Sequence, residues 1–287
     1  MATMIGGLAS TRPQQKTEIQ PENYRFLQDY IYRESGIVID ADKHYLLEAR
    51  LAPVARKQQV DTLNDLCNLL RATSARGELR QQVVEAMTTH ETLFFRDLAQ
   101  YDAVRTAILP PLIEQRKHTR QLSFWSAAAS SGQEVYSLAM MLLEMGLGDW
   151  RINILATDLS EQILDRAREG RFMQIEVNRG LPVSYLVKYF TRQGLDWQLK
   201  ENVRRMVRFQ KFDLRDSMRT LGPFDIVFCR NVLIYFDQET KKKILEGIRG
   251  TLHNGGHLML GGAETTLSLT DSFARVTVGQ AVLYRVP

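Results

Sequence analysis

The stretch LSFWSAAASSGQEVYSLAMM, residues 122–141, decides the fold class of this chain. It begins with an apolar run that suits a strand, passes through small residues, and continues with apolar residues at helical spacing. A strand, a tight turn and a helix in this order open a βα unit of a parallel sheet, whose ligands bind beyond the carboxyl ends of the strands. The turn is therefore either a ligand cradle or a packed connection, and its residues alone leave both interpretations open.

The composition of this turn argues against a phosphate ligand. Phosphate cradles need several glycines so that backbone N–H groups can approach the anion, but here Gly132 stands alone and Glu134 follows it. A carboxylate at that place repels a pyrophosphate and suits a cationic ligand, such as S-adenosylmethionine with its sulfonium and amino groups. Alternatively, Glu134 only stabilises the first turn of a helix.

Further apolar runs alternate with helical patterns after residue 111. This alternation predicts an α/β domain with a mainly parallel, Rossmann-like sheet and helices on both faces. The last run, AVLYRV at 281–286, is expected to pair as an edge strand. Residues 170–206 fit poorly as one crossover, which predicts an insertion with helix and short strands of its own. The domain is expected to span 98–287.

The first third of the chain has a different pattern. Residues 1–19 are rich in Gly, Ser, Thr and Gln and are predicted to form a flexible tail. Residues 20–97 are predicted to form an all-helical domain, with helices that begin at Pro21, after Asp40 or Asp42 and after Asp61, and a fourth over 78–91. Gly36 is expected to cap the first helix. The stretch 43–57 carries a charge of +3, typical of a solvated face or of a site for an acidic partner.

The composition excludes several classes of protein. No apolar run reaches the roughly 18 residues of a membrane span, and we expect a cytoplasmic protein without a leader. Cys67 and Cys229 lie far apart in the sequence and match neither a disulfide framework nor a metal site. The five histidines show no ligand spacing, so no metal is expected. The net charge of +4 permits a nucleic-acid or acidic-protein partner without requiring one.

Three further motifs supply candidate site residues. INILATD ends in Asp158, which either accepts hydrogen bonds from ribose hydroxyls or caps the following helix. FDIVFCRNVLIYFD, residues 224–237, delivers polar side chains in an apolar frame, where we expect catalysis. MTTHETLFFRD, residues 87–97, is weaker, because a Phe-Phe pair is usually core and its arginine usually solvated.

These motifs occur in the order and spacing of the CheR-type chemoreceptor glutamate methyltransferases, which the chain resembles from about residue 20 onward. The resemblance implies a helical domain joined to an S-adenosylmethionine-dependent methyltransferase domain with a small inserted β-subdomain. It implies a monomer that methylates the cytoplasmic helical domain of chemoreceptors, with no nucleic-acid partner and no membrane insertion. The catalytic pair would be Arg96 and Tyr235. The implied cofactor contacts are His90, Thr92, Arg96, Glu134, Asp158, Asp213, Leu214, Arg230 and Asn231.

Three departures from the family pattern stand out. His90 replaces an asparagine, and Gly262-Ala263-Glu264 replaces a G-H-S-E cluster. TRQGLDW, at 191–197, lacks the longer loop of members that dock on a receptor pentapeptide, so we expect a pentapeptide-independent enzyme. Two other functions remain open: a catalytically silent regulator that binds S-adenosylmethionine, and a nucleic-acid methyltransferase.

Overall fold

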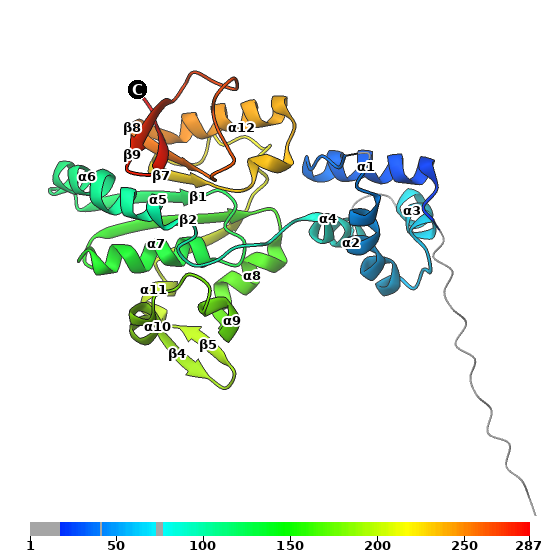
Figure 1. Cartoon of the computed structure of the whole chain (residues 1–287), viewed down its shortest axis with the longest axis horizontal. Coiled ribbons are helices and arrows are strands. Elements are labelled where there is room, and N and C mark those ends of the chain that lie inside the picture. The colour runs from blue at the N-terminus through cyan, green and yellow to red at the C-terminus, as the bar shows by residue number, and fades with distance from the viewer. Residues whose placement is uncertain (1–17, 41, 73–76) are drawn as a thin grey trace, which may run out of the picture. The chain divides into compact units, whose positions relative to one another are not determined.

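The computed structural model describes residues 18–40, 42–72 and 77–287, drawn as coloured ribbon in Figure 1. The chain divides into two compact units. The helical unit contains the described residues up to Tyr30 together with Ile39–Met87, and the sheet unit contains Ile31–Val38 and Thr88–Pro287. Of the predicted tail, only Glu18 and Ile19 are described, and Ile19 is buried. Among the described residues, no helix is long and apolar enough to cross a membrane.

Four helices carry the residues of the helical unit. They are α1 (Pro21–Ser35, of which residues after Tyr30 belong to the sheet unit), α2 (His44–Lys57), α3 (Leu63–Ala72) and α4 (Glu78–Met87). Leu47, Leu51 and Val54 are buried on one face of α2, because residues three and four apart share a helix face. Gly36 follows α1 with φ +75°, the left-handed cap expected from the sequence.

The fourth helix is shorter than predicted. It ends at Met87, so the prediction of a helix over 78–91 is wrong for its last four residues. Beyond Met87 the chain is held by tertiary contacts instead, because the carbonyl of His90 accepts a hydrogen bond from the Ser130 hydroxyl. Such contacts override the weak helix propensity of two adjacent threonines.

The sheet unit is built on seven strands in the order β6-β2-β1-β7-β8-β10-β9. The strands are β1 (Gln121–Ser126), β2 (Arg151–Asp158), β6 (Val207–Lys211), β7 (Phe224–Cys229), β8 (Leu252–Leu260), β9 (Ala274–Val278) and β10 (Ala281–Arg285). The pairs from β6 to β8 are parallel, and β10 is antiparallel to both of its neighbours. The mainly parallel α/β sheet predicted from the sequence is confirmed.

The predicted position of the last strand is wrong. β10 lies between β8 and β9, so the edges of the sheet are β6 and β9. The sequence pattern ARVTV of β9 is not strongly apolar, and only Val276 and Val278 are half-buried apolar residues in it. A short turn at Gly279, with φ +55°, joins β9 to β10 as a hairpin and moves β10 inward.

The helices of the sheet unit cover both faces of the sheet. They are α5 (Leu98–Ala103), a π-helical turn η1 (Val104–Ile108), α6 (Leu109–Arg116), α7 (Gln133–Glu144), α8 (Glu161–Glu169), a 3-10 turn η2 (Leu233–Tyr235) and α12 (Gln238–Thr251). Figure 1 shows α7 and α12 on opposite sides of the sheet. Successive strand residues point to opposite faces, so Phe124 packs in the cluster that holds α7, and Trp125 in the cluster that holds α12.

A small second sheet lies between α8 and β6 in the sequence. It consists of β3 (Arg171–Met173), β4 (Phe190–Gln193) and β5 (Asp196–Leu199), paired antiparallel in the order β3-β5-β4. Short helices accompany it: α9 (Gln174–Val177), α10 (Val183–Tyr189) and α11 (Glu201–Arg204). Phe172 and Phe190 pack with Phe94 in the main core. The inserted β-subdomain predicted from the sequence is confirmed.

Candidate active site

A cavity lies at the carboxyl ends of four parallel strands. It encloses about 930 Å³ not filled by protein atoms, part of which is open to solvent. Residues at or just after the ends of β1, β2, β6 and β7 line it. The strand order reverses its direction at β1, and open α/β sheets bind ligands at such a topological switch point. All ten sequence-predicted site residues line this one cavity: His90, Thr92, Arg96, Glu134, Asp158, Asp213, Leu214, Arg230, Asn231 and Tyr235.

The small-residue turn after β1 is both tightly packed and part of the cavity. Gly132 has φ +93°, and a Cβ atom there would lie 2.9 Å from the ring of Tyr136. Ala127, Ala128 and Ser130 line the cavity wall. The two interpretations of the turn are therefore compatible, because its glycine serves the packing of α7 while its Ala and Ser residues face the cavity.

Glu134 forms a buried ion pair. Its carboxylate accepts hydrogen bonds from the Ser126 hydroxyl at 2.8 Å and from Nη1 of Arg230 at 2.9 Å. The Arg230 side chain is only 2% exposed, and it also donates to the Arg96 carbonyl at 2.9 Å and to the Asp97 carboxylate. Burial alone would lower the pKa of Arg230, but Glu134, Tyr101 and Asp97 together outweigh burial, and the pKa of Arg230 is raised. The guanidinium thus ties the first turn of α7 to the segment after α4.

Asp158 ends β2 with its carboxylate facing backbone donors. Oδ2 accepts from the N–H of Ser130 at 2.9 Å and Oδ1 from the N–H of Ser160 at 3.1 Å. Burial raises the pKa of Asp158, although these hydrogen bonds act in the opposite direction. The cap of α8 is Ser160, whose hydroxyl accepts from the N–H of Ile163, so the alternative in which Asp158 caps this helix is wrong. Each carboxylate oxygen retains a lone pair for a further donor.

The segment between α4 and α5 extends along the cavity. Phe94 and Phe95 are buried, as the usual interpretation of a Phe-Phe pair expects, and the Phe95 N–H donates to the Ser137 hydroxyl at 2.9 Å. These contacts fix the backbone on either side, so that Thr92 and Arg96 line the cavity. The guanidinium of Arg96 donates to the carbonyl of Glu91 at 3.2 Å and, among the described residues, forms no ion pair.

Glu264 holds the loop after β7, a role that the sequence did not indicate. Its carboxylate accepts four backbone N–H groups, those of Gly261, Asn231, Val232 and Ile234, at 2.7 to 3.3 Å. The loop needs such support because Asn231 has φ +58°, a left-handed backbone conformation that is uncommon for residues other than glycine. The only signal in the sequence was the retained acid in Gly262-Ala263-Glu264.

Two lining residues come from a part of the chain that was assigned to the helical domain. Ser35 and Ile37 line the cavity beside Tyr235. Their segment, Ile31–Val38, belongs to the sheet unit, and the N–H of Val38 donates to the Tyr235 carbonyl at 2.9 Å. Sequence reasoning missed them because residues 21–35 form one continuous helical pattern.

The cavity wall contains more carboxylates than guanidiniums, although Arg215 and Arg179, outside the wall, pair with Asp213 and Glu91. Four carboxylates line the cavity, those of Glu91, Glu134, Asp158 and Asp213, against the two guanidiniums of Arg96 and Arg230. Apolar side chains, among them Phe212, Leu214 and Phe236, provide surface for a ring system. In the part of the chain that the structure describes, no group of His, Cys, Asp and Glu residues could hold a metal ion.

Comparison with known proteins covers nearly the whole described chain. Residues 90–282 match the model of the CheR methyltransferase SAM-binding domain, and residues 22–88 match that of the CheR methyltransferase all-alpha domain. Chemotaxis protein methyltransferase 1 of Pseudomonas aeruginosa is 40% identical, over 92% of this chain and 97% of that protein. Chemotaxis protein methyltransferase Cher2 of Pseudomonas putida is 39% identical, over 89% and 94%. Chemotaxis protein methyltransferase 1 of Vibrio cholerae is 38% identical, over 93% and 98%.

Proposed function

The chain belongs to the CheR methyltransferase family, and from this premise we propose that it transfers a methyl group from S-adenosylmethionine to glutamate side chains of chemoreceptors, forming methyl esters. One observation supports this most directly. Ten residues expected from separate motifs line a single cavity, and carboxylates outnumber guanidiniums in its wall. That charge suits a sulfonium cofactor better than a phosphate-bearing one.

The residues in the cavity wall fit S-adenosylmethionine, which supplies an electrophilic methyl group when bound. We assign Asp158 to the ribose hydroxyls, because its carboxylate oxygens keep lone pairs beyond those used by Ser130 and Ser160. Glu134 supplies negative charge for the cationic end. Asp213 and Leu214, with Phe212, follow β6 on the same wall, and His90, Thr92, Arg230 and Asn231 complete the proposed contacts.

The acceptor glutamate needs no general base. Its unperturbed pKa is about 4.3, so it is ionised at neutral pH. The chain must instead remove water from this carboxylate and align it, a positioning effect worth several kcal/mol. We assign Arg96 to hold the carboxylate, since its guanidinium has no ion-pair partner among the described residues. We assign Tyr235 to donate a hydrogen bond to it, because no hydrogen bond in the described residues occupies its hydroxyl.

Other parts of the proposal concern the whole chain. We propose a cytoplasmic monomer in which the basic α2 contacts the acidic helical region of a receptor. Two residues, Gly194 and Leu195, join β4 to β5. So short a hairpin supports methylation without docking on a receptor pentapeptide.

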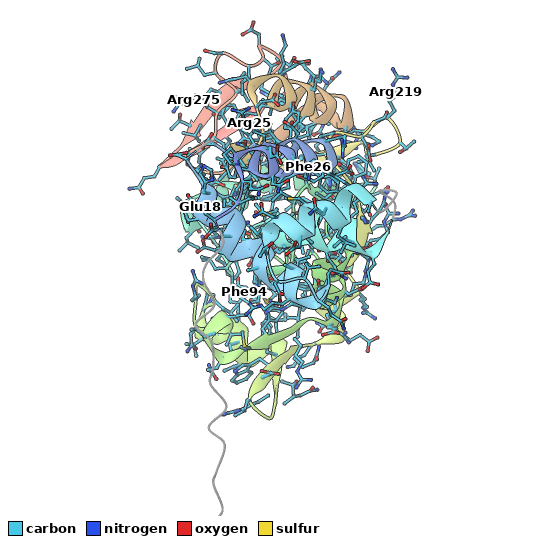
Figure 2. All side chains as sticks on the ribbon, turned by 90° about the vertical axis from the view of Figure 1, so that its right-hand side faces the viewer. Glu18, Arg25, Phe26, Phe94, Arg219 and Arg275 are labelled. Atoms are coloured by element: carbon cyan, nitrogen blue, oxygen red, sulfur yellow. The ribbon has the colours of Figure 1, made fainter. Side chains whose placement is uncertain are left out.

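The activity test uses receptor-containing membranes and S-adenosylmethionine labelled in its methyl group. Release of labelled methanol by base identifies a carboxyl methyl ester. We expect Arg96→Ala and Tyr235→Phe to lower kcat more than about tenfold, with unchanged affinity for S-adenosylhomocysteine in Tyr235→Phe. The matched control is Arg219→Ala, because this side chain is exposed, lies outside the cavity and points outward from the loop after β6 (Figure 2).

Each alternative has its own outcome in this experiment. Label that appears in RNA and not in receptor would replace the proposal with a nucleic-acid methyltransferase. Binding of S-adenosylhomocysteine without methyl transfer to any receptor would indicate a silent regulator. Wild-type turnover in Arg96→Ala or Tyr235→Phe would remove that residue from the proposed catalytic pair.

A further inference from the structure

The loop after β6 contains an arginine that no motif singled out. Arg215 binds the Asp213 carboxylate through Nε at 3.0 Å and through Nη2 at 2.7 Å. The same guanidinium donates to the carbonyls of Tyr32 at 3.3 Å, Arg33 at 3.0 Å and Glu34 at 2.8 Å. It therefore joins a residue of the cavity wall to the last turn of α1.

These carbonyls are the natural target of a cation. The last four carbonyls of a helix lack partners within it, and the helix dipole places partial negative charge there. The planar guanidinium binds three of them and a carboxylate at once, which a lysine ammonium cannot match in geometry, and the Tyr32 carbonyl also accepts from the N–H of Gly36 at 2.7 Å. Asp213 in turn raises the pKa of Arg215, which keeps the guanidinium charged.

The segment that Arg215 holds, residues 31–38, is part of the cavity. Ser35 and Ile37 line it, and the N–H of Val38 donates to the carbonyl of Tyr235 at 2.9 Å. A second attachment joins the hydroxyl of Tyr32 to the Asp237 carboxylate at 2.7 Å. Gly36 passes so close that a Cβ atom there would lie 2.8 Å from Cδ of Arg215.

We propose that Arg215 is a positioning residue that fastens the 31–38 segment over the loops after β6 and β7, and so completes the cofactor cavity between Asp213 and Tyr235. The inference rests on the proposed function only for the identity of the ligand. Arg215 does not line the cavity. It acts through the segment that it holds and through Asp213.

The test measures two quantities in the full-length chain. Calorimetry gives the dissociation constant for S-adenosylhomocysteine, and hydrogen–deuterium exchange reports the backbone of residues 36–38. We expect Arg215→Ala to raise the dissociation constant about tenfold, or about 1.4 kcal/mol, and to speed exchange in this segment. Arg215→Lys keeps the positive charge beside Asp213 but loses the planar set of N–H donors, so it should resemble Arg215→Ala. Arg219→Ala, four residues along on an exposed side chain, should match wild type.

Tyr32→Phe removes only the bond to Asp237 from a side chain that is 47% exposed. This variant should fold and should speed exchange at 36–38 by itself, which keeps the test valid if Arg215→Ala fails to fold. The proposal is overturned if Arg215→Lys behaves as wild type, or if exchange rises while affinity does not change. If the wild-type chain binds no S-adenosylhomocysteine, the proposed function fails, and the exchange data still decide whether Arg215 holds the segment.

Discussion

Replacing Glu134 with glutamine separates the two roles that the structure gives this residue. The change keeps the shape of the side chain and an acceptor for the Ser126 hydroxyl, but it removes the charge that faces Arg230 at 2.9 Å. The Arg230 side chain is 2% exposed, so water cannot compensate for the lost carboxylate. Glu134→Gln should therefore weaken both the fold and the binding of a cationic cofactor.

The loss of stability follows from the contacts that remain. Two unit charges at 2.9 Å attract by about 6 kcal/mol at an effective dielectric constant of 20. Removing one partner of a buried pair costs about 3–5 kcal/mol in measured cases. Here Asp97 and the Arg96 carbonyl still bind the guanidinium, which lowers the expected loss to about 2–3 kcal/mol. This corresponds to a fall of roughly 4–12 °C in the melting temperature.

Calorimetric melting without ligand and titration with S-adenosylmethionine measure the two roles separately. The matched control is Glu239→Gln, which breaks an exposed i,i+4 pair with Lys243 and should cost less than about 0.5 kcal/mol. An unchanged melting temperature in Glu134→Gln would refute the ion-pair argument. An unchanged affinity in a destabilised variant would leave Glu134 with a structural role only and remove it from the cofactor contacts.

Three further changes test other parts of the sheet unit. Glu264→Ala leaves four backbone N–H groups without their carboxylate acceptor. This variant should lose about 2–4 kcal/mol in the free energy of unfolding, measured with urea, and should have a lower kcat for methyl transfer. Full activity with normal stability would contradict this. Gly132→Ala should cost about 1–3 kcal/mol in thermal unfolding, and more than Gly146→Ala, because both glycines have positive φ but only Gly132 lies against Tyr136. Burial, with the nearby charge of Arg285, lowers the pKa of His257 to about 4. Between pH of about 6.5 and about 4, the unfolded chain therefore binds a proton that the folded chain does not, and the free energy of unfolding falls as the pH drops through this range. With allowance for solvent screening this is about 2 kcal/mol, and melting curves of His257→Gln should lack that part of the pH dependence.

The sequence predicted the parts of the fold that depend on local pattern. A short window of sequence shows the hydrophobic periodicity of the strand–turn–helix at 122–141, of the parallel strands and of the helical first third. The position of β10 was not predictable in this way, because the weakly apolar β9 gives no strand signal of its own. The end of α4 at Met87 likewise depends on contacts with Ser130, forty residues away from His90.

The residues of the candidate site likewise divide into those that local sequence pattern predicted and those that depend on distant contacts. Asp158, Arg230 and Asn231 were identified because they end or follow apolar strands, where parallel sheets bind ligands. Glu264 and Arg215 were missed because most of their partners are backbone atoms that lie far along the chain. Arg215, for example, binds the carbonyl of Glu34, 181 residues earlier. No spacing within a motif encodes such a contact.

The sheet unit is discontinuous in sequence, and this limits how the chain can be divided. The two family models meet between residues 88 and 90, whereas the sheet unit also requires Ile31–Val38. A fragment excised at residue 90 would lack Ser35 and Ile37 and would leave the Arg215 guanidinium without its three carbonyl acceptors. Transplanting this catalytic unit into another protein would therefore require both pieces of the chain, with the end of α1 supplied from outside the conventional domain.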